Sequence, residues 1–326
     1  MDRVVHAVAP TRICDIGGWT DTWFAGHGAV LNIAVTPVVE VRVEARAGDG
    51  PPVVEVENEG RPVAGPHPLL EATIDHVGVP DGVVLRVAVR SDAPLGASTG
   101  TSAAVVVALI GALDALTPGR RTPSEVAAEA HRVEVDRLGL QSGVQDQLCA
   151  AHGGVCAIEV TRYPSARVAP VDLPDGLRRE LDRRLLLVFL GPHRSSAVHE
   201  RVIAELSARD DGATPLPALR ALAHRARDAV AAGDLVALGR VMSENTALQA
   251  DLAPGIVSAG AEAVIDLARS AGALGWKVNG AGGEGGSVTL LCGDGRDRVA
   301  EAVAGLGAPV RLIPVACSPR GLRVRM

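Results

Sequence analysis

The chain has 326 residues, of which 47% are hydrophobic, and its formal net charge is −6. A chain of this length can bury a large core and is expected to form two domains. The mildly acidic balance argues against nucleic acid as a partner. No apolar run is long enough to span a bilayer and no signal-peptide pattern is present, so we expect a cytoplasmic protein without a membrane partner.

Cysteine and lysine usage gives further information on the class of protein. Lysine occurs once, at Lys277, and this Arg-heavy usage indicates a coding bias that makes the surviving lysine a candidate functional residue. The cysteines are scattered, odd in number and without CxxC spacing, which favours reduced, buried thiols over a disulfide framework or a zinc site. They are Cys14, Cys149, Cys156, Cys292 and Cys317.

Hydrophobic periodicity predicts an α+β chain in two halves. In the first half, strands are expected at 3–9, 29–35, 38–45, 53–57, 83–91 and 154–160, and helices at 101–116, 123–138 and 144–152. In the second half, a strand at 185–190 precedes helices at 196–208, 217–232, 234–250 and 256–272, a glycine loop and closing strands. The Pro-rich segment 163–174 is the natural boundary. The predicted domains are therefore 1–165 and 166–326.

The segment Pro94–Ala104 lies between an alternating strand and an apolar helical run. Its glycines let the backbone approach an anion, and the helix N-terminus presents unpaired N–H groups. This pattern is typical of a phosphate-binding loop, and an ordinary capped helix after a flexible turn explains it equally well. The segment is not a Walker A loop, because it has no lysine, and it does not match the dinucleotide fingerprint.

Two further segments accompany this loop. Near the N-terminus stands Pro10-Thr-Arg-Ile-Cys-Asp-Ile-Gly-Gly-Trp-Thr-Asp21, which we call the first motif. Near the C-terminus stands Lys277-Val-Asn-Gly-Ala-Gly-Gly-Glu-Gly-Gly286, the third motif. The alternating, β-branched segment 287–292 follows the third motif, so this loop is expected to join two strands. A strand at this place excludes a dinucleotide site.

In this order, the three segments resemble the signature motifs of the GHMP kinases, the superfamily of galactokinase, homoserine kinase and mevalonate kinase. The resemblance implies an N-terminal ribosomal-S5-domain-2-like domain, a C-terminal ferredoxin-like domain and an active site in the cleft between them. The form Gly-Gly-Trp-Thr-Asp is most similar to kinases of L-fucose, and next to kinases of heptose phosphate. The implied activity is ATP-dependent phosphorylation of a small molecule, with Mg²⁺.

Two carboxylates after the phosphate loop are candidate reaction residues. Thr122 and Glu125 form a capping box that starts a helix, and Glu134 lies on it. On the helix alone, a solvated Glu134 paired with Arg137 is the better interpretation. In the sugar kinases of the family, however, a Glu and a later Gly-x-x-Asp-Gln supply a magnesium ligand and the catalytic aspartate. The resemblance implies these roles for Glu134 and Asp146.

The remaining site residues also follow from the resemblance. Ser102 is the second metal ligand, and Arg12 pairs with Asp146 at the reaction centre. Ser98 and Glu284 depart from the glycines that the family usually has. The residues expected to bind ATP are Pro94, Gly96, Ser98, Gly100, Thr101, Ser102, Gly280, Gly282 and Gly283.

The first motif is expected to bind the acceptor together with Asp146. Thr20 and Asp21 offer partners for sugar hydroxyls, Gly17 and Gly18 let the backbone come close, and Trp19 can stack on a pyranose. An equally good interpretation makes the tryptophans packing residues. We expect phosphorylation of the anomeric hydroxyl of a free sugar or a heptose phosphate. The alternatives are a non-catalytic sugar sensor on the same fold and the diphosphate decarboxylase branch of the superfamily.

Overall fold

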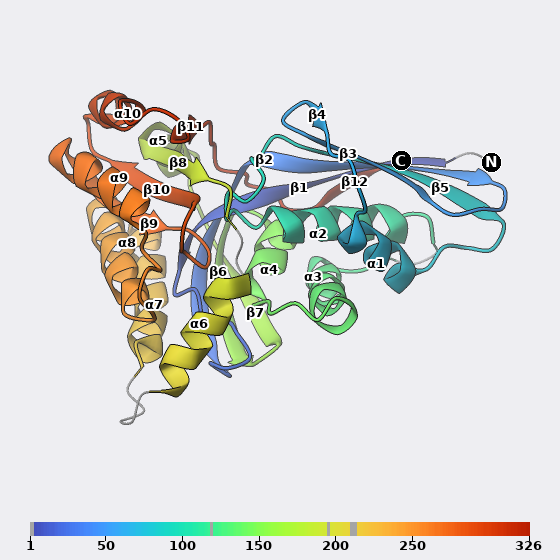
Figure 1. The fold of residues 1–326 in the computed structure, drawn as a ribbon, viewed down its shortest axis with the longest axis horizontal. Helices are drawn as coiled ribbons and strands as arrows, with labels where there is room; N and C mark the ends of the chain where they lie inside the picture. The colour runs from blue at the N-terminus through green and yellow to red at the C-terminus, as the bar shows by residue number, and fades with distance from the viewer. Residues whose placement is uncertain (1–2, 118–119, 194–195, 209–213) are drawn as a thin grey trace.

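The computed structural model describes residues 3–117, 120–193, 196–208 and 214–326. Within these ranges the chain builds an eight-stranded and a four-stranded sheet, both with helices packed against them (Figure 1). No helix in these ranges is long and apolar enough to cross a membrane. All five cysteines are free and buried, as predicted.

The first sheet is built around two long strands and has the order β12-β1-β2-β5-β3-β4, with β6 and β7 attached to β2. Its strands are β1 (Arg3–Ile16), β2 (Gly28–Ala47), β3 (Val53–Asn58), β4 (Arg61–Pro62), β5 (Val83–Ser91), β6 (Val155–Arg162), β7 (Ser165–Val171) and β12 (Arg323–Arg325). The strands predicted at 29–35 and 38–45 are one strand, β2. Its first half pairs with β6 and its second half with β5.

Strand β1 is longer than predicted, and this places much of the first motif on a strand. It pairs with β2 from Arg3↔Ala45 to Ile16↔Leu31, with a register shift between Ile13 and Ile16. Cys14, inside that shift, has φ of +56°. A bulge of this kind re-aims side chains, and here it lies beside Arg12 and Asp15.

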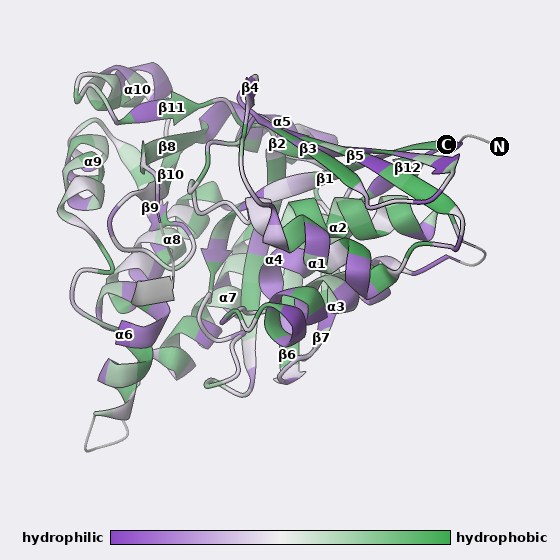
Figure 2. Ribbon diagram, turned by 45° about the vertical axis from the view of Figure 1, so that its right-hand side comes forward, coloured by the Kyte–Doolittle hydropathy of each residue, from purple (hydrophilic) through white to green (hydrophobic). Residues whose placement is uncertain are grey.

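Helices cover one face of the first sheet (Figure 1). They are α1 (Pro68–Val77), α2 (Thr101–Asp114), α3 (Pro123–Arg132) and α4 (Gln145–His152). Helix α2 is apolar on nearly every turn (Figure 2) and is buried from Ala103 to Asp114 except at Val105. A helix that is apolar all round belongs in the middle of a core, so the start of α2 is held rigidly.

The helix predicted to run to residue 138 changes form before its end. The capping box of Thr122 and Glu125 is present as predicted, and α3 ends at Arg132. A π-helical turn, η1 (Val133–Arg137), follows without a break. Such single-turn π segments often occur at functional sites, and this one contains Glu134.

The second sheet has the order β11-β8-β10-β9 and is antiparallel throughout. Its strands are β8 (Leu185–Gly191), β9 (Ala273–Val278), β10 (Gly286–Cys292) and β11 (Arg311–Ile313). The helices of this half are α5 (Asp175–Arg184), α6 (Ser196–Ser207), α7 (Leu216–Ala232), α8 (Leu235–Ala250), α9 (Ala259–Ser270) and α10 (Arg296–Ala304). Helices α6–α9 connect the first two strands and α10 the last two, which is the ferredoxin-like βαββαβ connectivity. The α+β prediction with a ferredoxin-like second half is confirmed.

The Pro-rich segment 163–174, expected at the boundary between the domains, is mostly a strand. Strand β7 occupies most of this segment and pairs with β6 from Val155↔Val171 to Arg162↔Ser165. The segment forms this strand because its apolar residues alternate with polar ones along an edge, where a proline is tolerated. The first sheet therefore extends to Val171, and β12 returns to it from the C-terminal end of the chain. The division at residue 165 itself stays a prediction.

Candidate active site

One cavity of about 580 Å³ brings the three motifs together. Arg12 reaches it from β1, and Asp21 from the loop after β1. The phosphate loop contributes residues 96–102, and the third motif contributes Gly280 and Ala281. Glu134 and Asp146 also line it. Arg12 and Gly280 are more than 260 positions apart in sequence, yet they line the same cavity.

The guanidinium of Arg12 and the carboxylate of Asp146 form a bidentate pair. Arg12 Nε donates to Oδ1 at 2.8 Å, and Nη2 donates to Oδ2 at 3.1 Å. Arg12 Nη1 also donates to the carbonyl of Ser98 in the phosphate loop. Burial opposes the charge of Arg12, but Asp146 and Asp15 outweigh it and raise the pKa of Arg12. The predicted pairing of Arg12 with Asp146 is therefore present in the structure.

The phosphate loop ends at a helix start that has no side-chain cap. Gly100, with φ of +69°, is the N-cap of α2, and no side chain caps this end or adds an acidic group to the first turn. Ser98 has φ of +57°, a conformation that glycine adopts more easily. The departure from glycine at this position is therefore accommodated with some strain. Thr101 and Ser102 line the cavity, whereas Pro94 does not.

The third motif meets the phosphate loop through Gly280. A Cβ at this position would lie 3.1 Å from the Cβ of Ser98 and 3.5 Å from Arg12 Nη2. Gly282 and Gly283 lie outside the cavity, where a Cβ would collide with Ile256 and Val198. These two glycines are needed for packing, so only Gly280 of the three lines the cavity.

The remaining residue of the glycine loop that departs from the family pattern is Glu284. Its side chain is exposed, and its backbone carbonyl accepts a hydrogen bond from His193 Nδ1 at 3.0 Å. The substitution of glycine by glutamate therefore adds no charge to the interior of the site.

Glu134 is buried rather than solvated, so the interpretation as a surface partner of Arg137 is wrong. Its Oε2 accepts hydrogen bonds from Ser142 Oγ at 2.6 Å and Gln147 Nε2 at 2.7 Å. Burial, reinforced by the charge of Asp146, raises the pKa of Glu134 to about 7. A buried carboxylate without a cationic partner favours a cation nearby. Glu134 lines the same cavity as Ser102.

Asp21 links the first motif to α4, the helix that carries Asp146. Its Oδ2 accepts the backbone N–H groups of Val144 at 2.9 Å and Gln145 at 3.1 Å, at the start of α4. Burial raises the pKa of Asp21 to about 6. This carboxylate therefore caps the helix that carries Asp146, and it also lines the cavity.

The structure does not bring Thr20, Gly17 and Gly18 to the cavity. The hydroxyl of Thr20 has the Gly17 carbonyl at 2.7 Å and the Ala29 carbonyl at 3.0 Å as acceptors for its proton, and it accepts a hydrogen bond from the Ala29 N–H. A Cβ on Gly17 would collide with the Ala29 carbonyl, and one on Gly18 would press on Asp15. These three residues shape the turn after β1 and lie outside the cavity lining, so the structure gives no support to the expectation that they bind substrate directly.

Two tryptophans lie in or just after the first motif, and of these Trp19 lines the cavity and Trp23 does not. Trp19 is 5% exposed and lies against His199, with ring centroids 5.0 Å apart. Trp23 packs edge-on against Phe24. Trp19 is therefore a packing residue, one of the two interpretations that the sequence left open, and it also forms part of the cavity wall.

Sequence reasoning missed several residues that line the cavity. His193 and His199 belong to no recognisable motif, so nothing in the sequence indicated them. Gln145 lies inside the segment that carries Asp146 and could have been named from it. Among the described residues of this cavity, buried polar atoms without a protein partner include Trp19 Nε1, Gln145 Oε1 and His193 Nε2.

Part of the cavity lining is apolar, and the sequence analysis did not foresee it. Helix α1 begins there, and its first turns contribute Leu69 and Leu70. The apolar lining residues in this region are Val56, Pro66, Pro68, Leu69, Leu70, Val89, Leu95 and Val105.

Comparisons with known proteins agree with this architecture. The chain matches the family model described as GHMP kinases N terminal domain over residues 68–154, and the model described as GHMP kinases C terminal over residues 226–308. A mevalonate kinase from Thermococcus sibiricus is 31% identical over 250 residues, which cover 74% of this chain and 69% of that enzyme. The chain therefore belongs to the GHMP kinase superfamily, and the resemblance in its three motifs is confirmed.

Other relatives differ in their named substrates. A D-glycero-alpha-D-manno-heptose 7-phosphate kinase from Campylobacter jejuni is 25% identical over 195 residues, 60% of this chain and 58% of that enzyme. The structure of Lactococcus lactis galactokinase complexed with galactose superimposes with a TM-score of 0.75 at 19% identity, covering 98% of this chain and 95% of that one. At this identity, the superposition shows the shared fold.

Proposed function

We propose that the protein is an ATP-dependent kinase that transfers the γ-phosphoryl group to a hydroxyl of a sugar. The observation that carries this proposal is the shared cavity, in which Asp146 and Glu134 face an uncapped helix N-terminus. Phosphoryl transfer needs a group that orients the attacking hydroxyl, a metal ligand and a cradle for phosphates. The residues that line the cavity can supply all three.

The phosphate loop fits a nucleotide. The uncapped start of α2 leaves backbone N–H groups for phosphate oxygens, and the positive end of its dipole favours anions. Arg12 adds a cation beside the carbonyl of Ser98. The apolar wall formed by Val56, Leu69 and Val105 offers a surface for the base, because nucleobase faces prefer apolar surroundings.

The metal assignment fits the buried carboxylate of Glu134. Mg²⁺ prefers oxygen ligands and keeps several waters, so one carboxylate, the hydroxyl of Ser102 and the nucleotide phosphates suffice. No cluster of three or more acidic, His or Cys side chains suited to a metal occurs in the described ranges. When bound, Mg²⁺ neutralises the charge on the transferred group. Ser142 and Gln147 hold the Glu134 carboxylate in place.

Asp146 is the proposed general base. Its carboxylate stands against the phosphate loop, since a Cβ on Gly100 would lie 3.1 Å from Asp146 Oδ2. It is therefore placed to accept the proton of the acceptor hydroxyl next to the transferred phosphoryl group. Arg12 orients this carboxylate with two hydrogen bonds and stabilises negative charge in the same region.

The acceptor end of the cavity supports a polyhydroxylated substrate. Trp19 Nε1, Gln145 Oε1 and His193 Nε2 are buried polar atoms without protein partners, and a sugar offers several hydroxyls that donate and accept. Asp21 adds a carboxylate, which pairs well with neighbouring hydroxyls. The heptose 7-phosphate kinase and the galactokinase among the similar proteins support the choice of a sugar as acceptor. The second candidate is mevalonate, because mevalonate kinases reach 31% identity.

A panel of acceptors tests the proposal. ADP release is measured with free aldoses, including L-fucose, with heptose phosphates and with mevalonate. We expect turnover of a free sugar or a heptose phosphate, and phosphorus–carbon coupling in the NMR spectrum of the product to identify the anomeric position. Turnover of mevalonate alone overturns the sugar assignment. Tight sugar binding without turnover by any acceptor favours the sensor alternative.

A further inference from the structure

Lys277, the only lysine of the chain, is buried inside the protein. Its side chain is 1% exposed, and Nζ faces three acceptors. It donates to Gln249 Oε1 at 2.9 Å and to the carbonyl of Val278, and it lies 3.5 Å from Asp15 Oδ1. Burial lowers the pKa of Lys277, and the charge of Asp15 opposes that shift. The three protons of an ammonium thus match three acceptors.

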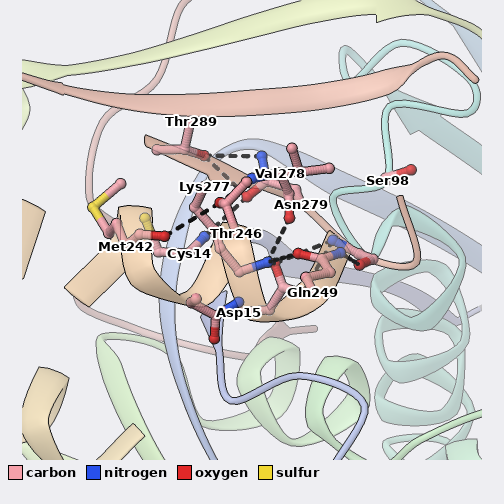
Figure 3. A network of polar contacts seen from close by, with 12 residues as sticks. Cys14, Asp15, Ser98, Met242, Thr246, Gln249, Lys277, Val278, Asn279 and Thr289 are labelled. Atoms are coloured by element: carbon pink, nitrogen blue, oxygen red, sulfur yellow. Dashed lines mark hydrogen bonds and ion pairs between the residues drawn. The ribbon is translucent and has the colours of Figure 1, made fainter. Parts of the chain in front are cut away.

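Two partners of Lys277 bind the backbone of Gly280, one at its N–H group and the other at its carbonyl. The carboxylate of Asp15 accepts the Gly280 N–H, with its two oxygens at 3.1 and 3.0 Å. Gln249 Nε2 donates to the Gly280 carbonyl at 3.0 Å. Figure 3 shows Lys277, Gln249 and Asp15 in one polar cluster. One ammonium therefore orients both side chains that fix this glycine.

Gly280 in turn contacts the groups proposed to handle the phosphates. A Cβ on Gly280 would lie 3.1 Å from the Cβ of Ser98 and 3.5 Å from Nη2 of Arg12, so only a glycine lets the backbone come this close to the phosphate loop and to the guanidinium that binds Asp146. A second connection runs from Ser287 Oγ, beside Asn279, to the Ala97 carbonyl at 2.6 Å. The cluster around Lys277 is thus joined to the phosphate loop at two points. It lies outside the cavity, because neither Lys277 nor Asp15 lines it.

We propose that Lys277 is a positioning residue that, through Asp15 and Gln249, fixes Gly280 against the phosphate loop and Arg12; this role rests on the kinase activity proposed above. An arginine cannot replace it. A guanidinium is planar, larger and carries five donors, so it neither fits a space that is 1% exposed nor finds partners for its extra N–H groups. This requirement explains a lysine in a chain that otherwise uses arginine.

Three variants test the proposal: Lys277→Met, Lys277→Arg and the double variant Lys277→Met/Asp15→Asn. In each, we expect kcat to fall by about 10²-fold, the cost of a displacement of about 1 Å at the reacting groups. MgADP affinity, measured by titration calorimetry, is expected to fall about tenfold, the equivalent of one hydrogen bond. The KM of the acceptor should stay near that of the wild type.

The double variant separates positioning from folding. Lys277→Met leaves the Asp15 charge buried without a partner, which destabilises the fold, whereas the double variant carries no unpaired charge. We expect the double variant to recover thermal stability but not kcat. Recovery of kcat and MgADP affinity together with stability, or wild-type kcat in Lys277→Arg, overturns the proposal.

A matched control comes from the ion pair of Arg121 and Asp114, at the far end of α2. Arg121 Nη1 donates to Asp114 Oδ1 at 2.6 Å, and the Asp114 side chain is 10% exposed. Arg121→Met should lower the melting temperature and leave kcat unchanged. An equal loss of kcat in this variant means that general destabilisation explains the effect and refutes positioning. Failure of the proposed kinase activity appears in the wild-type protein, whereas failure of this inference appears only in the variants.

Discussion

Arg12 on β1 and Asp146 on α4 are 134 residues apart, yet the guanidinium and the carboxylate meet through two hydrogen bonds of 2.8 and 3.1 Å. Arg12 is held in turn by the Ser98 carbonyl, and the start of α4 is capped by Asp21. The candidate base is therefore oriented by the strand, the phosphate loop and the first motif at once. This arrangement determines which substitutions are informative.

Asp146→Asn should lower kcat by about 10²- to 10⁴-fold, because the amide cannot accept the hydroxyl proton. MgADP affinity should change little, since Asp146 is not expected to bind the nucleotide. Steady-state kinetics and calorimetry measure the two quantities. Asp136→Asn, an exposed carboxylate on the neighbouring π-helical turn, serves as the control and should be silent. Near-normal turnover in Asp146→Asn removes this residue from the mechanism.

Ser102→Ala and Glu134→Gln should each raise the Mg²⁺ concentration needed for half-maximal activity, because each deletes an oxygen ligand. The larger effect is expected for Glu134→Gln, which also removes a charge. A magnesium titration at saturating nucleotide measures this requirement. The exposed Ser124, changed to alanine, provides a control for loss of a hydroxyl. Unchanged titrations in both ligand variants contradict the metal assignment.

The stability of the metal-free protein should fall as the pH rises from about 4.5 to about 7. The pKa of Glu134 is raised from 4.5 to about 7, so the native state keeps a proton that the unfolded state loses in this window. The resulting penalty reaches roughly 3 kcal/mol above the upper pKa. Urea unfolding across this pH range measures it. Glu134→Gln should reduce the slope by about half, because Asp21, whose pKa is raised from 3.8 to about 6, contributes a penalty of similar size.

Thr20→Val should lower stability by about 1–3 kcal/mol, because the Ala29 N–H is left buried without its acceptor. The KM of the acceptor should not change, since the hydroxyl of Thr20 is occupied by backbone groups. Urea unfolding and acceptor kinetics measure the two effects. A large rise in KM at wild-type stability would show that Thr20 binds substrate after all.

Asp21→Ala should strongly reduce phosphorylation of the true sugar while MgADP affinity stays near that of the wild type. A site built to hydrogen-bond a substrate rejects a mismatch by large factors. The variant also removes the cap of α4, which costs about 1 kcal/mol. Asp234→Ala, which removes the N-cap of the distant helix α8, is the matched control for this stability loss. Equal kinetic effects in both variants argue against sugar binding by Asp21.

The sequence predicted most of the elements and the central pair of the site. Hydrophobic periodicity located α2, α4, α7 and α8 to within one or two residues, because one face or all of each helix is apolar. The spacing of Glu134 and Asp146, read through the family resemblance, named the two carboxylates that share the cavity. The local pattern also predicted that the glycine loop of the third motif joins two strands, which are β9 and β10.

Other features depended on contacts between segments that are distant in sequence. Strand β7 forms because β6 offers an edge, which outweighs the prolines of that segment. The surroundings of Glu134 follow from the π-helical turn and from Ser142 and Gln147, and no helical pattern encodes that burial.

The division of the first motif was also decided by the tertiary structure. Within the first motif, Asp21 lines the cavity, whereas the neighbouring hydroxyl of Thr20 bonds to the backbone. Lys277 is the clearest case. The sequence showed that a lone lysine survived beside a glycine loop, but only the packing of α8 and β1 around it supplied Gln249 and Asp15, two of the three acceptors of the ammonium. Residue type is local information, whereas burial and hydrogen-bond partners are properties of the assembled fold.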